Sequence, residues 1–284
     1  MVTPYDESYN VDYGAIENLL KLQDEAKNGV LLLGSTGESL ALNMEEKKEI
    51  LKLALSLKLS VPIMVGVGGI HLPETMAWVE YLESLSVDAY LMVTPLYAKP
   101  GMLGQEQWFS SLMNNVTRPC MLYNIPGRTG CPLNPQVVKA LSEHPRFWAV
   151  KEASGSINDF QNYRFAAPEI SFYSGDDALM PHFAIAGSKG LVSVASNVWP
   201  KETNRYVQLC IKQTTQGIWP TWKIASDSLF TTSNPVPVKA LLHHKQLIKT
   251  PFVRFPLSHL DLDSRAKLLT AEEMVATWWN HLVQ

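Results

Sequence analysis

The sequence predicts an α/β protein, a (β/α)8 TIM barrel with a C-terminal helical extension. Two observations over residues 1–201 lead to this fold class. Short runs rich in Val, Ile and Leu alternate with longer amphipathic stretches, as expected of βα units that build a parallel sheet. The number of these runs approaches eight, the number of strands that closes a barrel of this kind. A chain of 284 residues is long enough for one such domain.

Seven segments are predicted as strands because each is a short apolar run. They are residues 30–33, 62–67, 89–94, 120–124, 147–151, 170–174 and 190–194. A stub at residues 1–3 would supply the eighth strand.

Crossover helices are predicted between these strands. Residues 44–57, 75–85 and 136–141 place apolar side chains at three- and four-residue spacings, which line one face of a helix. Asn43 and Asn134 are predicted N-caps.

The strand pattern ends in the C-terminal part, which is predicted to form several helices interrupted by prolines. We therefore predict a barrel over residues 1–201 and a helical extension over residues 202–284.

The composition excludes several classes of protein. Apolar residues make up 46% of the chain and charged residues 18%, which provides a core and gives no sign of disorder. The net charge of -3 is scattered, which argues against a nucleic-acid surface or a polybasic membrane patch. Three cysteines without ligand-like spacing suggest neither a disulfide framework nor a zinc site. With no signal peptide and no membrane-spanning apolar run, we expect a cytoplasmic protein whose partners are small molecules.

Lys151 is the first candidate catalytic residue. It ends the apolar run FWAVK, so its amine would lie at the carboxyl end of a strand, where barrel enzymes keep their active sites. A desolvated amine can attack a ketone and form an imine that serves as an electron sink. The alternative is a solvated surface lysine, and the neighbouring residues must decide between the two.

The segment LLLGSTGES follows a strand and precedes a helix, so it belongs to the same end of the barrel. Its backbone N–H groups could hold a carboxylate. The alternative is a turn and helix cap in which Ser35, Thr36 and Gly37 serve geometry alone. A Walker A phosphate loop is excluded because the GK[ST] ending is missing.

Two further loops offer polar side chains at strand ends. YNIPGRTG carries the phenol of Tyr123, which can relay a proton, and the guanidinium of Arg128, which can bind a carboxylate through two hydrogen bonds. VTPLYAKP adds the phenol of Tyr97. A tyrosine packed on the barrel rim and a surface arginine are the alternatives.

Asp176 and Asp177 resemble a metal or acid/base pair, but neither a histidine nor a third carboxylate lies at ligand spacing, so we predict a polar loop and helix cap. His243 and His244 fall in a predicted helix, where a surface role is expected.

Taken together, these motifs resemble the dihydrodipicolinate synthase family within the N-acetylneuraminate lyase superfamily of pyruvate-dependent aldolases. The segments occur in family order and at family spacing over nearly the whole chain, which is more specific than any one motif. They are GSTGES, VTPLY, YNIPGRTG, VKEASG, YSGDDA, GLVSVASN and NPVPVK.

The resemblance implies the condensation of pyruvate with L-aspartate 4-semialdehyde on the path to diaminopimelate and lysine, without a metal or organic cofactor. Lys151 would form the imine, Tyr123 would be the general acid/base, and Ser35 and Thr36 would contact the pyruvate carboxylate region. Ser35 stands where the family commonly has threonine, and its hydroxyl would link Tyr123 to Tyr97 in a proton relay.

The remaining assignments also come from the resemblance. Arg128 matches the arginine that binds the semialdehyde carboxylate, and Gly175 and Val192 match substrate-binding positions. The residue that matches Tyr97 reaches across a dimer interface in the family, whose usual assembly is a homotetramer of two tight dimers. Activity would then require dimerisation.

Two departures from the family pattern carry expectations. The chain starts later than its relatives, so either its start is misassigned or its first strand is abbreviated. In the second case an N-terminal extension of about eight residues should raise the melting temperature. Positions that bind lysine in lysine-inhibited members are mostly apolar here, which predicts weak or absent feedback inhibition. Only Glu74 fits the lysine-binding pattern, and the positions that depart from it hold Leu40, Met44, Lys47, Ile70 and Leu96.

Two alternative functions stay open. One is another pyruvate-dependent aldolase such as N-acetylneuraminate lyase, which shares the imine but takes a different aldehyde; Arg128 favours the synthase. The other is a catalytically silent barrel that binds a ligand or partner, which would be expected to lose Lys151, Tyr123 or the GSTGE loop.

Overall fold

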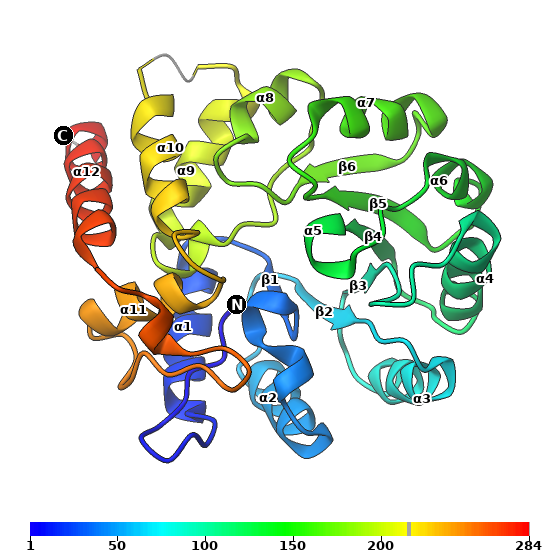
Figure 1. Cartoon of the computed structure of the whole chain (residues 1–284), viewed down its shortest axis with the longest axis horizontal. Helices are drawn as coiled ribbons and strands as arrows, with labels where there is room; N and C mark the ends of the chain where they lie inside the picture. The colour runs from blue at the N-terminus through cyan, green and yellow to red at the C-terminus, as the bar shows by residue number, and fades with distance from the viewer. Residues whose placement is uncertain (215–216, 284) are drawn as a thin grey trace. The chain divides into compact units, whose positions relative to one another are not determined.

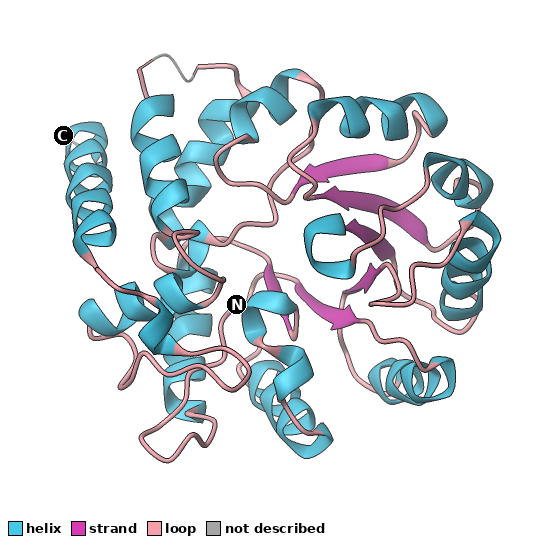
Figure 2. Cartoon of the chain, viewed as in Figure 1, coloured by secondary structure: helices cyan, strands magenta, loops and turns pink. Residues whose placement is uncertain are grey.

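The structure is a computed structural model that describes residues 1–214 and 217–283 (Figure 1). The chain forms two compact units, one of Met1–Val61 with Ser193–Gln284 and one of Pro62–Val192. Helices alternate with short strands along the chain (Figure 2), so the predicted α/β class is confirmed. The described residues contain no helix that is both long and apolar enough to span a bilayer.

A parallel sheet forms the centre of the unit of residues 62–192. Its strands pair in chain order, each with the next. They are β2 (Ile63–Val67), β3 (Ala89–Val93), β4 (Cys120–Asn124), β5 (Phe147–Glu152) and β6 (Ser171–Ser174). Buried apolar side chains run almost without interruption along β3 and β4, which is typical of parallel strands covered on both faces.

The helices of this unit follow the strands one by one, which confirms the predicted βα alternation. Figure 1 shows α3, α4, α6 and α7 on one face of the sheet. The side chain of Asn134 accepts a hydrogen bond from the N–H of Gln136, as the predicted N-cap requires. The helices are α3 (Leu72–Glu83), α4 (Met102–Met113), α5 (Pro126–Thr129), α6 (Pro135–Leu141), α7 (Ile157–Ala166) and α8 (Met180–Ile185).

The predicted strand over residues 190–194 is wrong in its extent. A single parallel bridge joins Leu191 to Ser174 at the end of β6. The N–H of Ser174 donates to the carbonyl of Gly190 at 3.0 Å, and the N–H of Val192 donates to the carbonyl of Ser174 at 2.8 Å. The segment therefore extends the sheet by only a short stretch of pairing.

In the other unit, one short strand accompanies the N-terminal helices. Asn43 and Glu46 form a capping box at the start of α2, which confirms the predicted N-cap. The elements of residues 1–61 are α1 (Tyr13–Glu25), β1 (Val30–Leu32), the 3-10 turns η1 (Ser35–Gly37) and η2 (Ser39–Ala41), and α2 (Met44–Ser56).

The predicted strand at residues 1–3 is not formed. The terminal amine of Met1 donates to the carbonyl of Leu31 at 2.6 Å, and the N–H of Val2 donates to the side chain of Asn197 at 2.9 Å. Because the amide of Val2 bonds to a side chain rather than to a strand backbone, no strand ladder forms here, although Val2 and Thr3 are buried.

The C-terminal part of this unit is helical, as predicted. The ring of Trp222 stacks on that of Tyr206, with the ring centres 4.3 Å apart, and packs edge to face against Trp199 and Trp278. These rings form an aromatic core. These helices share a unit with residues 1–61, so the boundary between residues 201 and 202 stays a prediction; residues 215–216 and 284 of the predicted extension lie outside the described residues. The elements are η3 (Ala195–Asn197), α9 (Pro200–Ile211), α10 (Trp219–Ser228), α11 (Val236–His244), η4 (His259–Asp261) and α12 (Ala266–Val283).

Candidate active site

Lys151 lies next to Tyr123 at the carboxyl ends of two neighbouring strands. The register of β4 and β5 makes the two residues direct partners. Lys151 is 8% exposed and Tyr123 is 7% exposed, and the lysine Nζ lies 4.2 Å from the centre of the tyrosine ring. A buried amine beside a phenol is an arrangement that can form an imine and move a proton.

Gly175 allows the stem of Lys151 to lie against the end of β6. Its N–H donates to the carbonyl of Glu152 at 2.6 Å. A Cβ at this position would lie 2.7 Å from Cε of Lys151 and 2.6 Å from Cβ of Ala153. Only glycine fits there without displacing a neighbour. Val192, which is partly buried, pairs with the same end of β6.

A buried carboxylate at the end of β5 was missed by the sequence analysis. Glu152 is fully buried; one of its oxygens accepts from Nδ2 of Asn124 at 2.7 Å, and the other accepts from the N–H of Ser154. Desolvation raises the pKa of the Glu152 carboxyl, while these hydrogen bonds oppose the shift. The hydrogen bond between Asn124 and Glu152 joins the ends of β4 and β5, one residue beyond Tyr123 and Lys151. The sequence does carry one signal for Glu152: a polar residue directly follows both Tyr123 and Lys151, at the ends of two predicted neighbouring strands.

Tyr97 and Arg128 lie in the segments that follow β3 and β4. Arg128 is exposed in the last turn of α5. The N–H of Tyr97 donates to the carbonyl of Thr129 at 3.3 Å, which joins its loop to α5. The side chain of Tyr97 is 90% exposed, and its φ of 66° is left-handed. The structure thus brings the two loops together while the phenol of Tyr97 projects into solvent.

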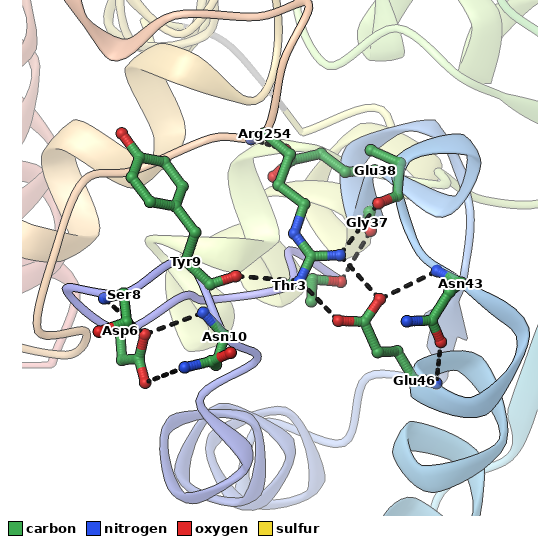
Figure 3. Close-up of polar contacts among 11 residues, drawn as sticks. Thr3, Asp6, Ser8, Tyr9, Asn10, Gly37, Glu38, Asn43, Glu46 and Arg254 are labelled. Atoms are coloured by element: carbon green, nitrogen blue, oxygen red, sulfur yellow. Dashed lines mark hydrogen bonds and ion pairs between the residues drawn. The ribbon is translucent and has the colours of Figure 1, made fainter.

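Ser35 and Thr36 belong to the other unit, in the 3-10 turn η1. Ser35 is exposed, and the hydroxyl of Thr36 accepts a hydrogen bond from Nδ2 of Asn234 at 2.8 Å. The hydroxyl of Thr3 donates to the carbonyl of Gly37 at 2.7 Å (Figure 3). No side chain caps this turn, so the predicted alternative of a helix cap receives no support from Ser35 or Thr36.

Asp176 and Asp177 form a polar loop, as predicted, but the predicted helix cap is not seen, because the N-cap position of α8 is Leu179 and makes no side-chain cap hydrogen bond. The carboxylate of Asp176 accepts from the N–H groups of Ala178 and Leu179 at 3.1 and 3.2 Å, directly before α8. Within the described part of the chain, no three His, Cys, Asp or Glu side chains converge as a metal site would require. His243 and His244 end α11, in agreement with the predicted helix.

Comparison with known proteins identifies the family. The family model of the dihydrodipicolinate synthetase family matches residues 1–273. The 4-hydroxy-tetrahydrodipicolinate synthase of Francisella philomiragia is 44% identical over 283 residues, which cover 99% of this chain and 96% of that protein. The enzyme of the same name from Wolbachia pipientis (subsp. Culex pipiens) is 44% identical over 278 residues, 98% of this chain and 94% of the relative.

Solved structures give the same result. The chloride-inhibited dihydrodipicolinate synthase of Acinetobacter baumannii, complexed with pyruvate, is 30% identical and superposes with a TM-score of 0.91 over 97% of both chains. The 4-hydroxy-tetrahydrodipicolinate synthase of Methylacidiphilum fumariolicum is 31% identical, with a TM-score of 0.92 over 98% of this chain and 94% of that one. The chain belongs to the dihydrodipicolinate synthetase family.

Proposed function

We propose that this protein is a 4-hydroxy-tetrahydrodipicolinate synthase, which condenses pyruvate with L-aspartate 4-semialdehyde in lysine and diaminopimelate biosynthesis. The observation that carries the proposal is the buried amine of Lys151 beside Tyr123, in a chain of this family. Lys151 and Tyr123 are the groups that a Schiff-base lyase needs first, a nucleophilic amine and a proton carrier.

In the proposed mechanism, Nζ of Lys151 attacks the ketone carbon of pyruvate, and loss of water leaves an imine. The protonated imine draws electrons from the neighbouring methyl group, so that a proton can leave and an enamine forms. The enamine carbon then attacks the aldehyde carbon of the second substrate, whose oxygen takes up a proton. Tyr123 would carry these protons on its phenol oxygen; the centre of its ring lies 4.2 Å from the amine, which makes it a neighbour of the reacting group.

Six other residues complete the proposed site. Ser35 and Thr36 would contact the pyruvate carboxylate, and Ser35 would also join Tyr123 to Tyr97 in a proton relay. Arg128, exposed on α5, would bind the carboxylate of the semialdehyde through two hydrogen bonds. Gly175 and Val192 would line the substrate pocket. The 90% exposure of Tyr97 supports a role in the site of a second subunit.

The architecture is part of the proposal. A parallel sheet whose strands follow chain order, together with TM-scores of 0.91 and 0.92 to enzymes of this family, supports a closed (β/α)8 barrel over residues 1–201 with a helical extension over residues 202–284. The exposed Tyr97 supports a homotetramer built as a dimer of dimers. The three cysteines are buried free thiols, which supports a reducing compartment such as the cytoplasm.

The test is the mass of the intact protein after borohydride reduction in the presence of pyruvate. We expect one pyruvate-derived adduct on the wild type and none on Lys151→Ala. Lys189→Ala is the matched control, because it removes an exposed lysine of the same unit and should keep the adduct. A wild type without an adduct would refute the imine mechanism and favour a silent barrel.

A panel of aldehydes then identifies the second substrate. Turnover with L-aspartate 4-semialdehyde is expected, with a large loss in Arg128→Ala because the carboxylate loses its charged partner. If only a sugar-derived aldehyde is turned over, the protein is another pyruvate-dependent aldolase.

A further inference from the structure

One segment of the C-terminal part contacts both ends of the turn that contains Thr36. Nδ2 of Asn234 donates to the Thr36 hydroxyl at 2.8 Å, and the ammonium of Lys239 forms an ion pair with Glu38. Both contacts lie within one unit of the chain. We propose that residues 234–239 position the turn of residues 35–38 to receive the pyruvate carboxylate, with Asn234 orienting the Thr36 hydroxyl and Lys239 anchoring Glu38. The inference rests on the proposed function and adds two positioning residues to it.

The direction of the Asn234 hydrogen bond decides what Thr36 can do. A threonine hydroxyl has one hydrogen to donate and two lone pairs that accept. The amide NH2 of Asn234 can only donate, so it occupies a lone pair of Thr36 and leaves the hydroxyl hydrogen directed elsewhere. A carboxylate can only accept. Asn234 therefore keeps Thr36 in the donor orientation that a carboxylate ligand needs.

Glu38 fixes the other end of the turn through buried charges. Its φ of 53° is left-handed, and the residue is 6% exposed. One carboxylate oxygen pairs with Lys239, which is fully buried, and the other accepts the N–H of Arg254 at 2.8 Å. A shift of Glu38 would leave the buried ammonium without its partner, which is costly.

Further contacts hold these two partners of Glu38 in place. Lys239 donates to the carbonyl of Phe252 at 2.8 Å and lies 4.0 Å from the ring centre of Tyr5. The guanidinium of Arg254 makes two bonds, of 2.5 and 2.7 Å, to the carboxylate of Glu46 (Figure 3). The turn is thus attached to a rigid network on the side of Glu38, as a preorganised ligand site requires.

The test compares two ketones, one with a carboxylate next to the reacting carbon and the other with the uncharged methyl ester of that carboxylate. Pyruvate carries a carboxylate, whereas methyl pyruvate has the same ketone without the negative charge. The concentration that half-saturates the borohydride-trapped adduct is measured for both compounds. Loss of the Thr36 donor should weaken the binding of pyruvate and leave the binding of methyl pyruvate unchanged. General damage to the fold would weaken the binding of both ketones alike.

Asn234→Asp and Asn234→Ala test whether Asn234 orients the Thr36 hydroxyl. At neutral pH an aspartate would accept the Thr36 hydrogen and add a negative charge, so the half-saturating pyruvate concentration should rise by about tenfold or more. Alanine leaves the hydroxyl able to rotate, so the rise should be about threefold. The half-saturating concentration of methyl pyruvate should change by less than about twofold in either variant. A merely structural role predicts instead that each variant raises the half-saturating concentrations of pyruvate and methyl pyruvate by the same factor.

Lys239→Met tests the anchor, with Lys245→Met as its matched control. Lys245 pairs with Glu272 at 2.6 Å in the same unit, so its loss removes a lysine–glutamate pair that is partly exposed and does not involve the turn. Pyruvate binding should weaken selectively in Lys239→Met and stay at the wild-type value in the control. If Lys239→Met does not fold, the two Asn234 variants decide the outcome.

The results separate the inference from the proposed function. A wild type that traps neither ketone refutes the function. A wild type that prefers pyruvate, with Asn234→Asp retaining the full preference, leaves the function intact and overturns the inference. A wild type without preference for the charged ketone overturns the inference as well, because Thr36 then does not bind the carboxylate.

Discussion

Gly175→Ala tests the packing around Lys151 with a single methyl group. Carbon atoms in contact normally lie about 3.5–4.0 Å apart, whereas the added Cβ would lie 2.7 Å from Cε of Lys151 and 2.6 Å from Cβ of Ala153. The overlap on each side is therefore about 1 Å. The Lys151 stem can rotate away, but Cβ of Ala153 is fixed to the backbone, so the strand end itself must shift.

Two effects should follow from this overlap. Overpacking of a filled site costs about 1–3 kcal/mol of unfolding free energy, which would lower the melting temperature by several degrees. A displacement of the reacting amine by about 1 Å should lower kcat by about 100-fold. The assays are thermal unfolding without substrate and steady-state kinetics with pyruvate and L-aspartate 4-semialdehyde.

Gly101→Ala provides the control for this experiment. A Cβ at Gly101 meets nothing within 4 Å, and its φ of -69° suits any residue. We expect this variant to keep the wild-type kcat and to lose little stability. If Gly175→Ala retains the wild-type kcat and melting temperature, the close approach of the β6 end to Lys151 is refuted.

Three further predictions concern buried charge and ligand response. Lys239→Met leaves the carboxylate of Glu38 buried without its cation, so we expect urea unfolding to reveal a loss of about 3–5 kcal/mol. The double variant Glu38→Met with Lys239→Met should recover much of that loss, and a double variant as unstable as the single one would contradict the explanation. Burial raises the folded-state pKa of Glu152 above its ordinary value of 4.5, so stability from this group is full below pH 4.5 and is lost as the pH rises through the folded-state pKa. The melting temperature of Glu152→Gln relative to wild type should therefore increase from pH 4.5 toward neutral pH. A difference in melting temperature that stays constant with pH would contradict the raised pKa of Glu152. Finally, sub-millimolar L-lysine should leave the activity unchanged, because apolar side chains cannot satisfy its charged groups; strong inhibition would refute this. The apolar side chains at the matching positions are Leu40, Met44, Ile70 and Leu96.

The sequence by itself determined the order of most elements and led to the proposed chemistry of the site. Strands and crossover helices carry periodic apolar patterns, and a cap such as Asn43 acts within a few residues of its helix, so both can be found from local pattern. Lys151 and Tyr123 could be predicted as neighbours because each lies at the end of an apolar run, and strands of a parallel sheet end at the same edge.

The tertiary structure alone decided which distant groups meet. Asn234 and Lys239 contact Thr36 and Glu38 across about 200 positions of the chain, and such pairs leave no periodic signal in one sequence. The same holds for Glu152, whose buried charge becomes visible only when β4 and β5 are in register. Local pattern also failed at residues 1–3 and 190–194, because a strand exists only where a neighbouring backbone supplies its hydrogen bonds.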